Sequence, residues 1–498
     1  MRWTIRAAFL EYRLEMKMKR KRRRIKLVIL FLGSLFLLLG IYGIGSISTY
    51  GTRWFSYRRN PRLPIQKAEV LPGDILDRNG AVLATCDAQG NRIYAQDAEM
   101  RKAVVHVVGD ASGKVSNAVE SFQTGYLYGF ERPFWELASD LLSGKQGKGD
   151  TVQLTIDGTL SREIVRTFSS LPLSAGHAGA AVVMNWQTGE VLAEVSLPGF
   201  DPLLASQVQE TDAGQPFWNR ATQSLYPPGS IFKTVTAAAA LESLENPEQQ
   251  IYMCEEGVDV DGFVIHDFGN ARHGQMTMQE AYLVSCNQIF AHIALAVGDT
   301  KLRACAERFG FNDNFLFRDM VVSNSTYPVK NGRSRYEVAA SGFGQSAIAA
   351  SPLHLCLIAS AVADHGIMME PILLHTVSSE NGAVRTRLSP RVYRKALDVT
   401  EADTLKQYML EVVRSGTGRK AACEGLTIGG KTGTADSTLR GSPISYGWFV
   451  GFCAEEACPY SVCVLVEDID SGEGGGSTAA PIAARIFSYL RDMKSSGR

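Results

Sequence analysis

Ser230 and Lys233 are the first residues whose types and spacing suggest chemistry. A Pro-Pro-Gly run at 227–229 ends any preceding helix, so Ser230 is expected to open a helix over Ile231–Leu244. Side chains three residues apart share a helix face, which lets the lysine amine reach the serine hydroxyl. A neutral, desolvated amine can activate that hydroxyl as a nucleophile, and the helix N-terminus can stabilise an oxyanion. Taken alone, the pair is more typical of a surface helix start with a solvated lysine.

A second group, Lys431-Thr432-Gly433-Thr434, stands at the end of a strand expected over Thr427–Lys431. A cation with two hydroxyl groups suits a substrate carboxylate, and a glycine on a strand lets a ligand approach the backbone closely. Alternation along a strand puts Lys431 and Gly433 on one side and the two threonines on the other, unless the strand twists. The alternative is an ordinary solvent-facing edge strand.

The third group, Ser285-Cys286-Asn287, interrupts a helical region whose start is predicted by a capping box at Thr277 and Glu280. A serine and an asparagine two residues apart at a helix break can both point into one cleft. There the serine can pass a proton and the asparagine can bind an amide. The same pattern recurs at Ser379-Glu380-Asn381 before Gly382, where a turn is expected instead.

The nine cysteines and eight histidines show no spacing that resembles a zinc site, so neither a metal nor a cofactor is predicted. Most cysteines stand in apolar runs and are expected to be small core residues. A cross-hairpin disulfide between Cys453 and Cys458 is an alternative for that pair. The glycine-rich run Glu473–Ser477 lacks the lysine of a phosphate-binding loop and is expected to be a plain loop.

The strands and helices that must position these groups predict an α+β fold. Two apolar strands form a hairpin around residues 185–189, a helical block follows, and further strands and a closing helix come last. This order predicts an antiparallel sheet flanked by helices. The expected ranges are strands at 151–156, 178–184, 190–196, 427–431, 447–453 and 460–467, and helices at 159–168, 355–363 and 481–490.

The N-terminal region predicts a membrane anchor. Residues 1–26 carry eleven Lys and Arg against two acids, although the whole chain has a net charge of zero. The next residues, Leu27–Ile47, are apolar and long enough to span a bilayer. The basic cluster predicts a cytoplasmic N-terminus, with Arg53, Arg58 and Arg59 on the far side. A cleaved signal peptide and a buried core helix are the alternatives, and the neutral overall charge argues against a nucleic-acid binder.

In this order the three motifs resemble those of the serine transferase family of penicillin-binding proteins and β-lactamases. The gaps between the motif serines and lysine are 55 and 146 residues, and the long second gap is similar to a penicillin-binding protein rather than to a compact class D β-lactamase. Further similar runs are Ala180–Asp201, Asn219-Arg220-Ala221, Gly344-Gln345 with Ser351-Pro352-Leu353, and Trp448–Phe452.

Upstream, residues 72–84 predict two short strands around a hairpin turn at Asn79-Gly80. Within them, Gly73–Ala84 resembles the N-terminal signature of the class B members. About 100 residues at 53–150 are too few for the glycosyltransferase domain of class A members, which implies a monofunctional class B protein. Two positions depart from the family pattern. Pro72 replaces the usual arginine of the signature, and Ser346 replaces a glycine that commonly follows Gly344-Gln345.

The resemblance implies a penicillin-sensitive D,D-transpeptidase that cross-links peptidoglycan stem peptides ending in D-Ala-D-Ala. Ser230 would carry the acyl-enzyme and Lys233 would be its base. Ser285 would relay a proton, Asn287 would orient the donor peptide, and backbone N–H groups of Ser230 and Thr434 would form the oxyanion hole. The carboxylate would be bound by Lys431, Thr432 and Thr434, with Gly433 between them. Repulsion between Lys233 and Lys431 is expected to help keep Lys233 neutral.

The implied organisation is a basic cytoplasmic tail at 1–26, a transmembrane anchor at 27–50, a class B-type module at 53–149 and a transpeptidase domain at 150–498. Implied partners are stem peptides, β-lactams, the bacterial cell membrane crossed once, and a multi-pass glycan polymerase of the SEDS type, without nucleic acid. The alternatives are a membrane-anchored β-lactamase, a β-lactam sensor and a catalytically inactive scaffold.

Overall fold

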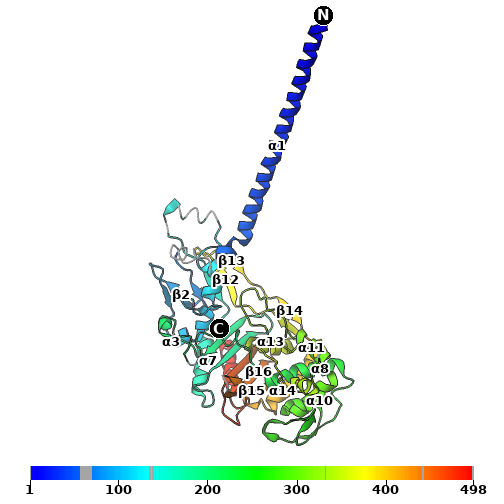
Figure 1. Ribbon diagram of the computed structural model, residues 1–498. Helices are drawn as coiled ribbons and strands as arrows, with labels where there is room; N and C mark the ends of the chain where they lie inside the picture. The colour runs from blue at the N-terminus through cyan, green and yellow to red at the C-terminus, as the bar shows by residue number, and fades with distance from the viewer. Residues whose placement is uncertain are drawn as a thin grey trace.

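A computed structural model describes residues 2–55, 70–133, 136, 140, 142–144, 146–212, 214–330, 332–439 and 442–495. One long helix stands away from a body in which sheets and helices are mixed (Figure 1). The α+β fold class predicted from the sequence is confirmed. Arg58 and Arg59, which were expected on the far side of the membrane, lie outside the described residues.

The centre of the body is a five-stranded antiparallel sheet in the order β15-β16-β17-β5-β6. Its first hairpin and its last strand match the expected ranges closely. The other two strands are much longer than expected, because the motif strand continues past Lys431 and pairs along its whole length with its neighbour. The bounds are β5 Gly179–Asn185, β6 Val191–Leu197, β15 Ile428–Leu439, β16 Ser442–Cys453 and β17 Tyr460–Glu467.

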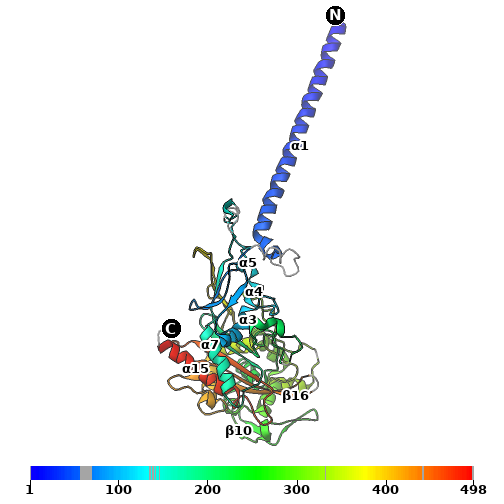
Figure 2. The same ribbon diagram turned by 90° about the vertical axis from the view of Figure 1, so that its left-hand side faces the viewer.

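Helices cover both faces of this sheet because its strands are apolar on both sides. Helix α13 (Pro352–Ala363) packs on one face, in the same core cluster as Val182 and Leu465. Helices α7 (Gly158–Ser170) and α15 (Ala479–Ser495) share the other face with Val183 and Val464 (Figure 2). Alternate residues of one strand thus enter two different cores.

A block of helices packs beside β15, the edge strand of this sheet. Its central helix is the Ala-rich α8 (Lys233–Ser243), which is buried over most of its length. The capping box expected at Thr277 and Glu280 opens the next helix. The other members are α9 Met278–Val284, α10 Asn287–Val297, α11 Asp299–Arg308, α12 Arg335–Ser341 and α14 Val399–Arg414, with short strands β11 Ile367–Met369 and β14 Val392–Lys395.

Between α8 and α9 the chain forms a small projection, here called the 252–276 lobe. It consists of two short two-stranded sheets, β10-β7 and β8-β9, and one short 3-10 turn. The bounds are β7 Tyr252–Cys254, β8 Val258–Val260, β9 Phe263–Ile265, η3 Phe268–Asn270 and β10 Gly274–Met276.

A second sheet, in the order β13-β12-β4-β1-β2-β3, lies next to the helices of the N-terminal region. The expected hairpin at Asn79-Gly80 joins β1 and β2. The boundary at residue 150 remains a prediction, and this sheet draws strands from both sides of it. The bounds are β1 Ile75–Leu76, β2 Val82–Cys86, β3 Arg92–Tyr94, β4 Thr151–Leu154, β12 Leu374–Ser378 and β13 Val384–Arg387, with helices α3 Ala98–Val108, α4 Val119–Phe122 and α5 Thr124–Leu127.

The N-terminal helix α1 runs from Arg2 to Phe55, so the basic tail and the expected anchor form one continuous helix. Within it, Glu15–Gly43 is long and apolar enough to cross a membrane. None of this apolar window is buried against the described residues of the body, which suits a helix that would lie in lipid.

Two smaller expectations have clear outcomes. Ser379–Gly382 forms a turn between β12 and β13, as predicted. Cys453 and Cys458 are not joined by a disulfide, so that suggestion is wrong, and the Cys453 thiol donates to Glu455 Oε2 at 2.7 Å.

Candidate active site

Ser230 lies on a 3-10 turn, η2 (Gly229–Phe232), which leads directly into α8. The α-helix therefore begins at Lys233 and not near Ser230, as the sequence had indicated. The turn is tight because Gly229 has a φ of 52°, and a Cβ there would lie 2.6 Å from the carbonyl oxygen of Thr434. This geometry places the Lys233 Nζ 3.0 Å from the Ser230 Oγ.

The Lys233 amine is fully buried and surrounded by oxygen atoms. Besides Ser230, it contacts the Ser285 carbonyl at 2.5 Å, the Ser285 Oγ at 3.2 Å and the Asn287 Oδ1 at 2.8 Å. Burial lowers the pKa of Lys233 from 10.5 to about 7, against an opposing effect of Cys286 and Asp267. The amine therefore has a substantial neutral fraction near neutral pH.

Ser285 occupies the break between α9 and α10 in a left-handed conformation, with φ 64° and ψ 39°. The turn points its side chain back towards α8, and α10 starts at Asn287. The Ser285 Oγ lies between the two lysine amines, 2.8 Å from Lys431 Nζ and 3.2 Å from Lys233 Nζ. A hydroxyl in this position can exchange protons with either amine.

Lys431 reaches the same point from β15 and is also fully buried. Its amine contacts the Ser285 Oγ and, at 2.9 Å, the carbonyl of Thr432. Burial lowers the pKa of Lys431 well below 10.5, and the nearby Lys233 lowers it further. The expected repulsion between the two cations thus appears mainly in the pKa of Lys431, whereas burial is the main cause of the lowered pKa of Lys233.

The remaining residues of this group face in different directions. Thr432 is largely buried, and its hydroxyl donates to Thr417 Oγ1 at 2.6 Å. Gly433 packs against the nucleophile turn, because a Cβ there would lie 3.0 Å from Ile231 Cγ1 and 3.2 Å from the Pro228 carbonyl. This glycine therefore lets β15 approach the nucleophile turn closely, and because it also lines the cleft, the expected close approach of a ligand stays a prediction.

A cleft of about 900 Å³ opens over these groups. Ser230, Ser285, Asn287, Thr432, Gly433 and Thr434 all line it, whereas Lys233 and Lys431 lie beneath its floor. All eight residues proposed from the sequence thus converge on one place. Its size is in the usual range for a ligand site.

Sequence reasoning missed part of this cleft. Thr417 lines it, and so does the glycine-rich stretch Gly472–Ser477, which was expected to be a plain loop. A Cβ on Gly474 would lie 2.6 Å from Thr434 Oγ1, and one on Gly475 would lie 1.9 Å from the Trp448 carbonyl. The cluster of glycines was the available signal, because it permits such close packing against the sheet.

Together these contacts describe a serine hydroxyl beside a buried amine with a pKa near neutrality, and a second hydroxyl linked to a second amine. Such an arrangement can take a proton from Ser230, hold it, and return it to a leaving group through Ser285. Its chemistry is therefore acyl transfer through a covalent serine intermediate.

Comparison with known proteins agrees with this geometry. The family model described as the penicillin-binding protein transpeptidase domain matches residues 179–488, which include the three motifs. The chain belongs to this family. As a class B penicillin-binding protein, it has its family match in the part of the chain that carries the five-stranded sheet and the helical block.

Similar proteins include the peptidoglycan D,D-transpeptidase PbpA of Mycolicibacterium smegmatis, which is 29% identical over 87% of this chain and 92% of its own length. The peptidoglycan D,D-transpeptidase MrdA of Acinetobacter baumannii is 29% identical over 63% of this chain and 51% of its own. The structure of penicillin-binding protein A from M. tuberculosis as a ceftriaxone acyl-enzyme complex has a TM-score of 0.77 at 27% identity, and the match covers 86% of this chain and 99% of that one.

Proposed function

We propose that this protein is a peptidoglycan D,D-transpeptidase that cross-links stem peptides ending in D-Ala-D-Ala and is inhibited by β-lactams. The observation that carries the proposal is the 3.0 Å contact between Ser230 Oγ and the buried Lys233 amine at the floor of the cleft. The names of similar proteins as D,D-transpeptidases, and their acyl-enzyme complexes with β-lactams, support the same activity.

In the acylation step, Ser230 Oγ attacks the penultimate carbonyl of the donor peptide while Lys233 Nζ accepts its proton. The carbonyl oxygen is then stabilised by the backbone N–H groups of Ser230 and Thr434. Ser285 Oγ, which contacts both amines, delivers a proton to the nitrogen of the departing D-Ala. A neighbouring stem-peptide amine attacks the ester in the second half-reaction, and the same groups act in reverse.

Donor binding involves the other end of the cleft. The Thr434 hydroxyl lines the cleft and can donate to the terminal carboxylate, and the Thr432 hydroxyl can join it by turning away from Thr417, while Asn287 holds the peptide amide. Lys431 lies directly behind them and is buried, so its contribution is electrostatic. An arriving carboxylate raises the pKa of Lys431 and favours its protonated form.

The experiment is mass spectrometry of the full chain after treatment with penicillin. The expected result is a stable increase by the mass of one intact penicillin, mapped to Ser230, and its absence in Ser230→Ala. Rapid return to the unmodified mass with hydrolysed penicillin would identify a β-lactamase instead. No adduct on a folded wild-type chain would contradict the proposal.

We further propose that α1 places the N-terminus in the cytoplasm and the body outside, with the division into a 1–26 tail, a 27–50 anchor, a 53–149 module and a 150–498 transpeptidase domain. The charge of residues 1–26 supports this orientation. Labelling of single cysteines introduced at the two ends of α1, with a reagent that does not cross membranes, tests it. Labelling of the N-terminal cysteine in intact cells would contradict the orientation.

We also propose a SEDS-type glycan polymerase as a membrane partner. The apolar side chains of α1, such as Leu30, Phe31 and Phe36, are exposed and available to another membrane protein. Replacing residues 27–43 with an unrelated apolar span should keep the protein in the membrane and abolish co-purification of the polymerase. Unchanged co-purification would contradict a contact through α1.

A further inference from the structure

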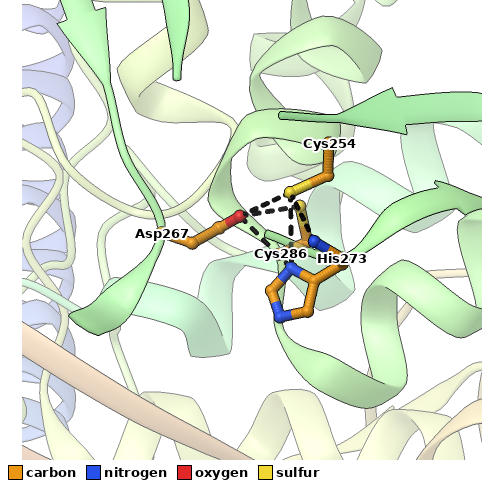
Figure 3. Close-up of side chains that lie close together, drawn as sticks. All are labelled: Cys254, Asp267, His273 and Cys286. Atoms are coloured by element: carbon orange, nitrogen blue, oxygen red, sulfur yellow. Dashed lines mark hydrogen bonds and ion pairs between the residues drawn. The ribbon is translucent and has the colours of Figure 1, made fainter. Parts of the chain in front are cut away.

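Four side chains with metal-binding atoms converge beside the cleft, although their spacing in the sequence had indicated no metal site. They are Cys254, Asp267, His273 and Cys286, and their ligand atoms all lie within 4.8 Å of one another. Figure 3 shows the two sulfur atoms, one carboxylate oxygen and one imidazole nitrogen pointing toward a common centre. The first three belong to the 252–276 lobe, and the fourth lies between Ser285 and Asn287.

Four of the six distances between the ligand atoms lie between 3.0 and 3.4 Å, and the other two are within 4.8 Å. Asp267 Oδ2 lies 3.0 Å from Cys254 Sγ, 3.2 Å from Cys286 Sγ and 3.3 Å from His273 Nδ1. Cys254 Sγ lies 3.4 Å from the same imidazole nitrogen. Bond lengths of about 2.0–2.3 Å around tetrahedral zinc imply edges of about 3.3–3.8 Å, so only small movements would complete the coordination.

Neighbouring groups donate hydrogen bonds to three of these side chains, as is usual around metal ligands. Backbone N–H groups of His273 and Ile289 donate to the two sulfur atoms, each at 3.4 Å. The other carboxylate oxygen of Asp267 accepts from the backbone N–H of Asn287, and Gln288 Nε2 donates to Oδ2 at 3.3 Å. Hydrogen bonds of this kind orient metal ligands and hold thiolates in their charged form. The two thiols and the carboxylate are buried, while the imidazole is partly exposed and leaves a path to solvent.

The 252–276 lobe buries few apolar side chains. Its strands are three residues long, and the large apolar side chains of Met253, Phe263 and Phe268 are exposed. A small apolar cluster joins Val260 and Ile265 to the helical block, and Tyr252 and Met276 pack against the edge of the main core. A segment with so little core usually needs a metal or a disulfide to stay folded.

We propose that Cys254, Asp267, His273 and Cys286 bind one zinc ion, which joins the 252–276 lobe to the turn that carries Ser285 and Asn287. Two thiolates, an imidazole and a carboxylate in tetrahedral positions suit zinc, whereas calcium and magnesium prefer six or more oxygen ligands. All four positions are filled by the protein, so the site is structural and leaves no place for a metal-bound water.

The charge balance agrees with such an ion next to Lys233. Zinc brings two positive charges and displaces the protons of two thiols. The net charge of the ligands and the ion together therefore stays at that of a single carboxylate. The net charge next to the Lys233 amine therefore stays the same when the ion binds.

The first experiment measures metal in the full chain purified in detergent under reducing conditions. We expect about one zinc per chain by elemental analysis, and thiolate-to-metal charge-transfer absorption after replacement by cobalt. His273→Ala should lower the zinc content about tenfold or more, and His273→Cys should restore it. Cys86→Ser is the matched control, because that cysteine lies in the N-terminal sheet and its loss should leave the zinc content unchanged.

Two results would overturn the proposal. One is a folded wild-type chain, judged by unfolding temperature, that holds no zinc after dialysis against micromolar zinc. The other is a disulfide between Cys254 and Cys286, found by peptide mapping of the protein isolated from cells with free thiols blocked. Both are measured on the wild-type chain, so they do not depend on whether a variant folds.

A second experiment concerns the role of the ion, and it rests on the proposed function. Removing zinc with a chelator should slow acylation by penicillin about tenfold or more, and added zinc should restore it, because Ser285 and Asn287 flank a ligand. The same rate with and without bound zinc would overturn this role while leaving the site in place. A chain that binds zinc and is never acylated would contradict the proposed transpeptidase but not the zinc site.

Discussion

The two walls of the cleft are built in different ways. The wall formed by β15 carries Lys431 and Gly433 and belongs to a five-stranded sheet with a large core on each face. The opposite wall, around Ser285 and Asn287, adjoins the 252–276 lobe, where Met253, Phe263 and Phe268 are exposed. Two cores therefore fix the first wall, whereas the second combines the packing of α9 and α10 in one core with polar contacts around Asp267. The first wall should therefore respond to substitutions that disturb packing, and the second to the loss of its polar contacts.

The largest expected effect comes from the group that both walls share. Lys233→Ala should lower the rate of acylation by penicillin by a factor of about 10²–10⁴, which is the usual contribution of a general base. The unfolding temperature should change little, because the substitution also removes a buried amine. Stopped-flow acylation measures the rate, and Lys301→Ala on the exposed side of α11 is the control. A rate near that of wild type would exclude Lys233 as the base.

The pH dependence should be the next largest effect. The pKa of Lys233 is about 7, so its neutral fraction falls as the pH falls below that value. Between pH 8 and pH 5 the acylation rate should therefore drop by about two orders of magnitude. Because the pKa of this amine in the unfolded chain is higher, the free energy of unfolding should rise as the pH increases from about 7. A rate that is flat over this interval contradicts the role given to the amine.

Gly433→Ala tests the packed wall. The new Cβ would lie 3.0 Å from Ile231 Cγ1, which should displace the nucleophile turn and slow acylation by about tenfold to a hundredfold. Shortening the neighbour in Gly433→Ala/Ile231→Ala should recover part of the rate, as a double-mutant cycle would show. Equal losses in the single and double variants would mean that the two side chains do not meet.

Hydrogen exchange should distinguish the walls directly. Amides of β16 and β17 should exchange slowly whether or not a chelator is present, because their strands are buried between two helix layers. Amides of β7 and β10 should exchange faster, and faster still after zinc is removed. Equal protection of both sets in the chelated protein would contradict the difference between the walls.

The smallest effect is expected at Thr417, a residue of the cleft that the sequence did not reveal. Thr417→Val removes the acceptor of the 2.6 Å hydrogen bond from Thr432. A lost hydrogen bond of about 1 kcal/mol should raise the penicillin concentration for half-maximal acylation rate about fivefold, with little change in the maximal rate. Thr417→Ser, which keeps the hydroxyl, should behave like the wild type. A fall in the maximal rate alone would place Thr417 elsewhere in the reaction.

Sequence reasoning worked best where local chemistry dictates structure. The hairpin of β5 and β6, the capping box at Thr277 and the turn after Ser379 were predicted because a few adjacent residues determine each of them. The three motifs were found because each is short. Their meeting in one cleft followed from the resemblance to a family and not from the residues alone.

The parts that were missed depend on contacts between distant residues. The strand expected to end at Lys431 runs on to Leu439, because pairing with β16 supplies partners that local sequence does not reveal. Strands and a helix separate Asp267 from the other three proposed ligands in the sequence, so no short spacing pattern indicates the site. Even the placement of Ser230 before the first α-helical residue reflects Gly229 packing against β15.

The six-stranded sheet has a consequence for how the protein is made. Strands β1, β2 and β3 leave the ribosome early, whereas β12 and β13, which complete the sheet beyond β4, are synthesised much later. During synthesis, the early strands must wait with an unpaired edge until the late pair arrives. A chaperone that shields unpaired strands is therefore most useful to this protein in that interval, before residue 387 has been synthesised.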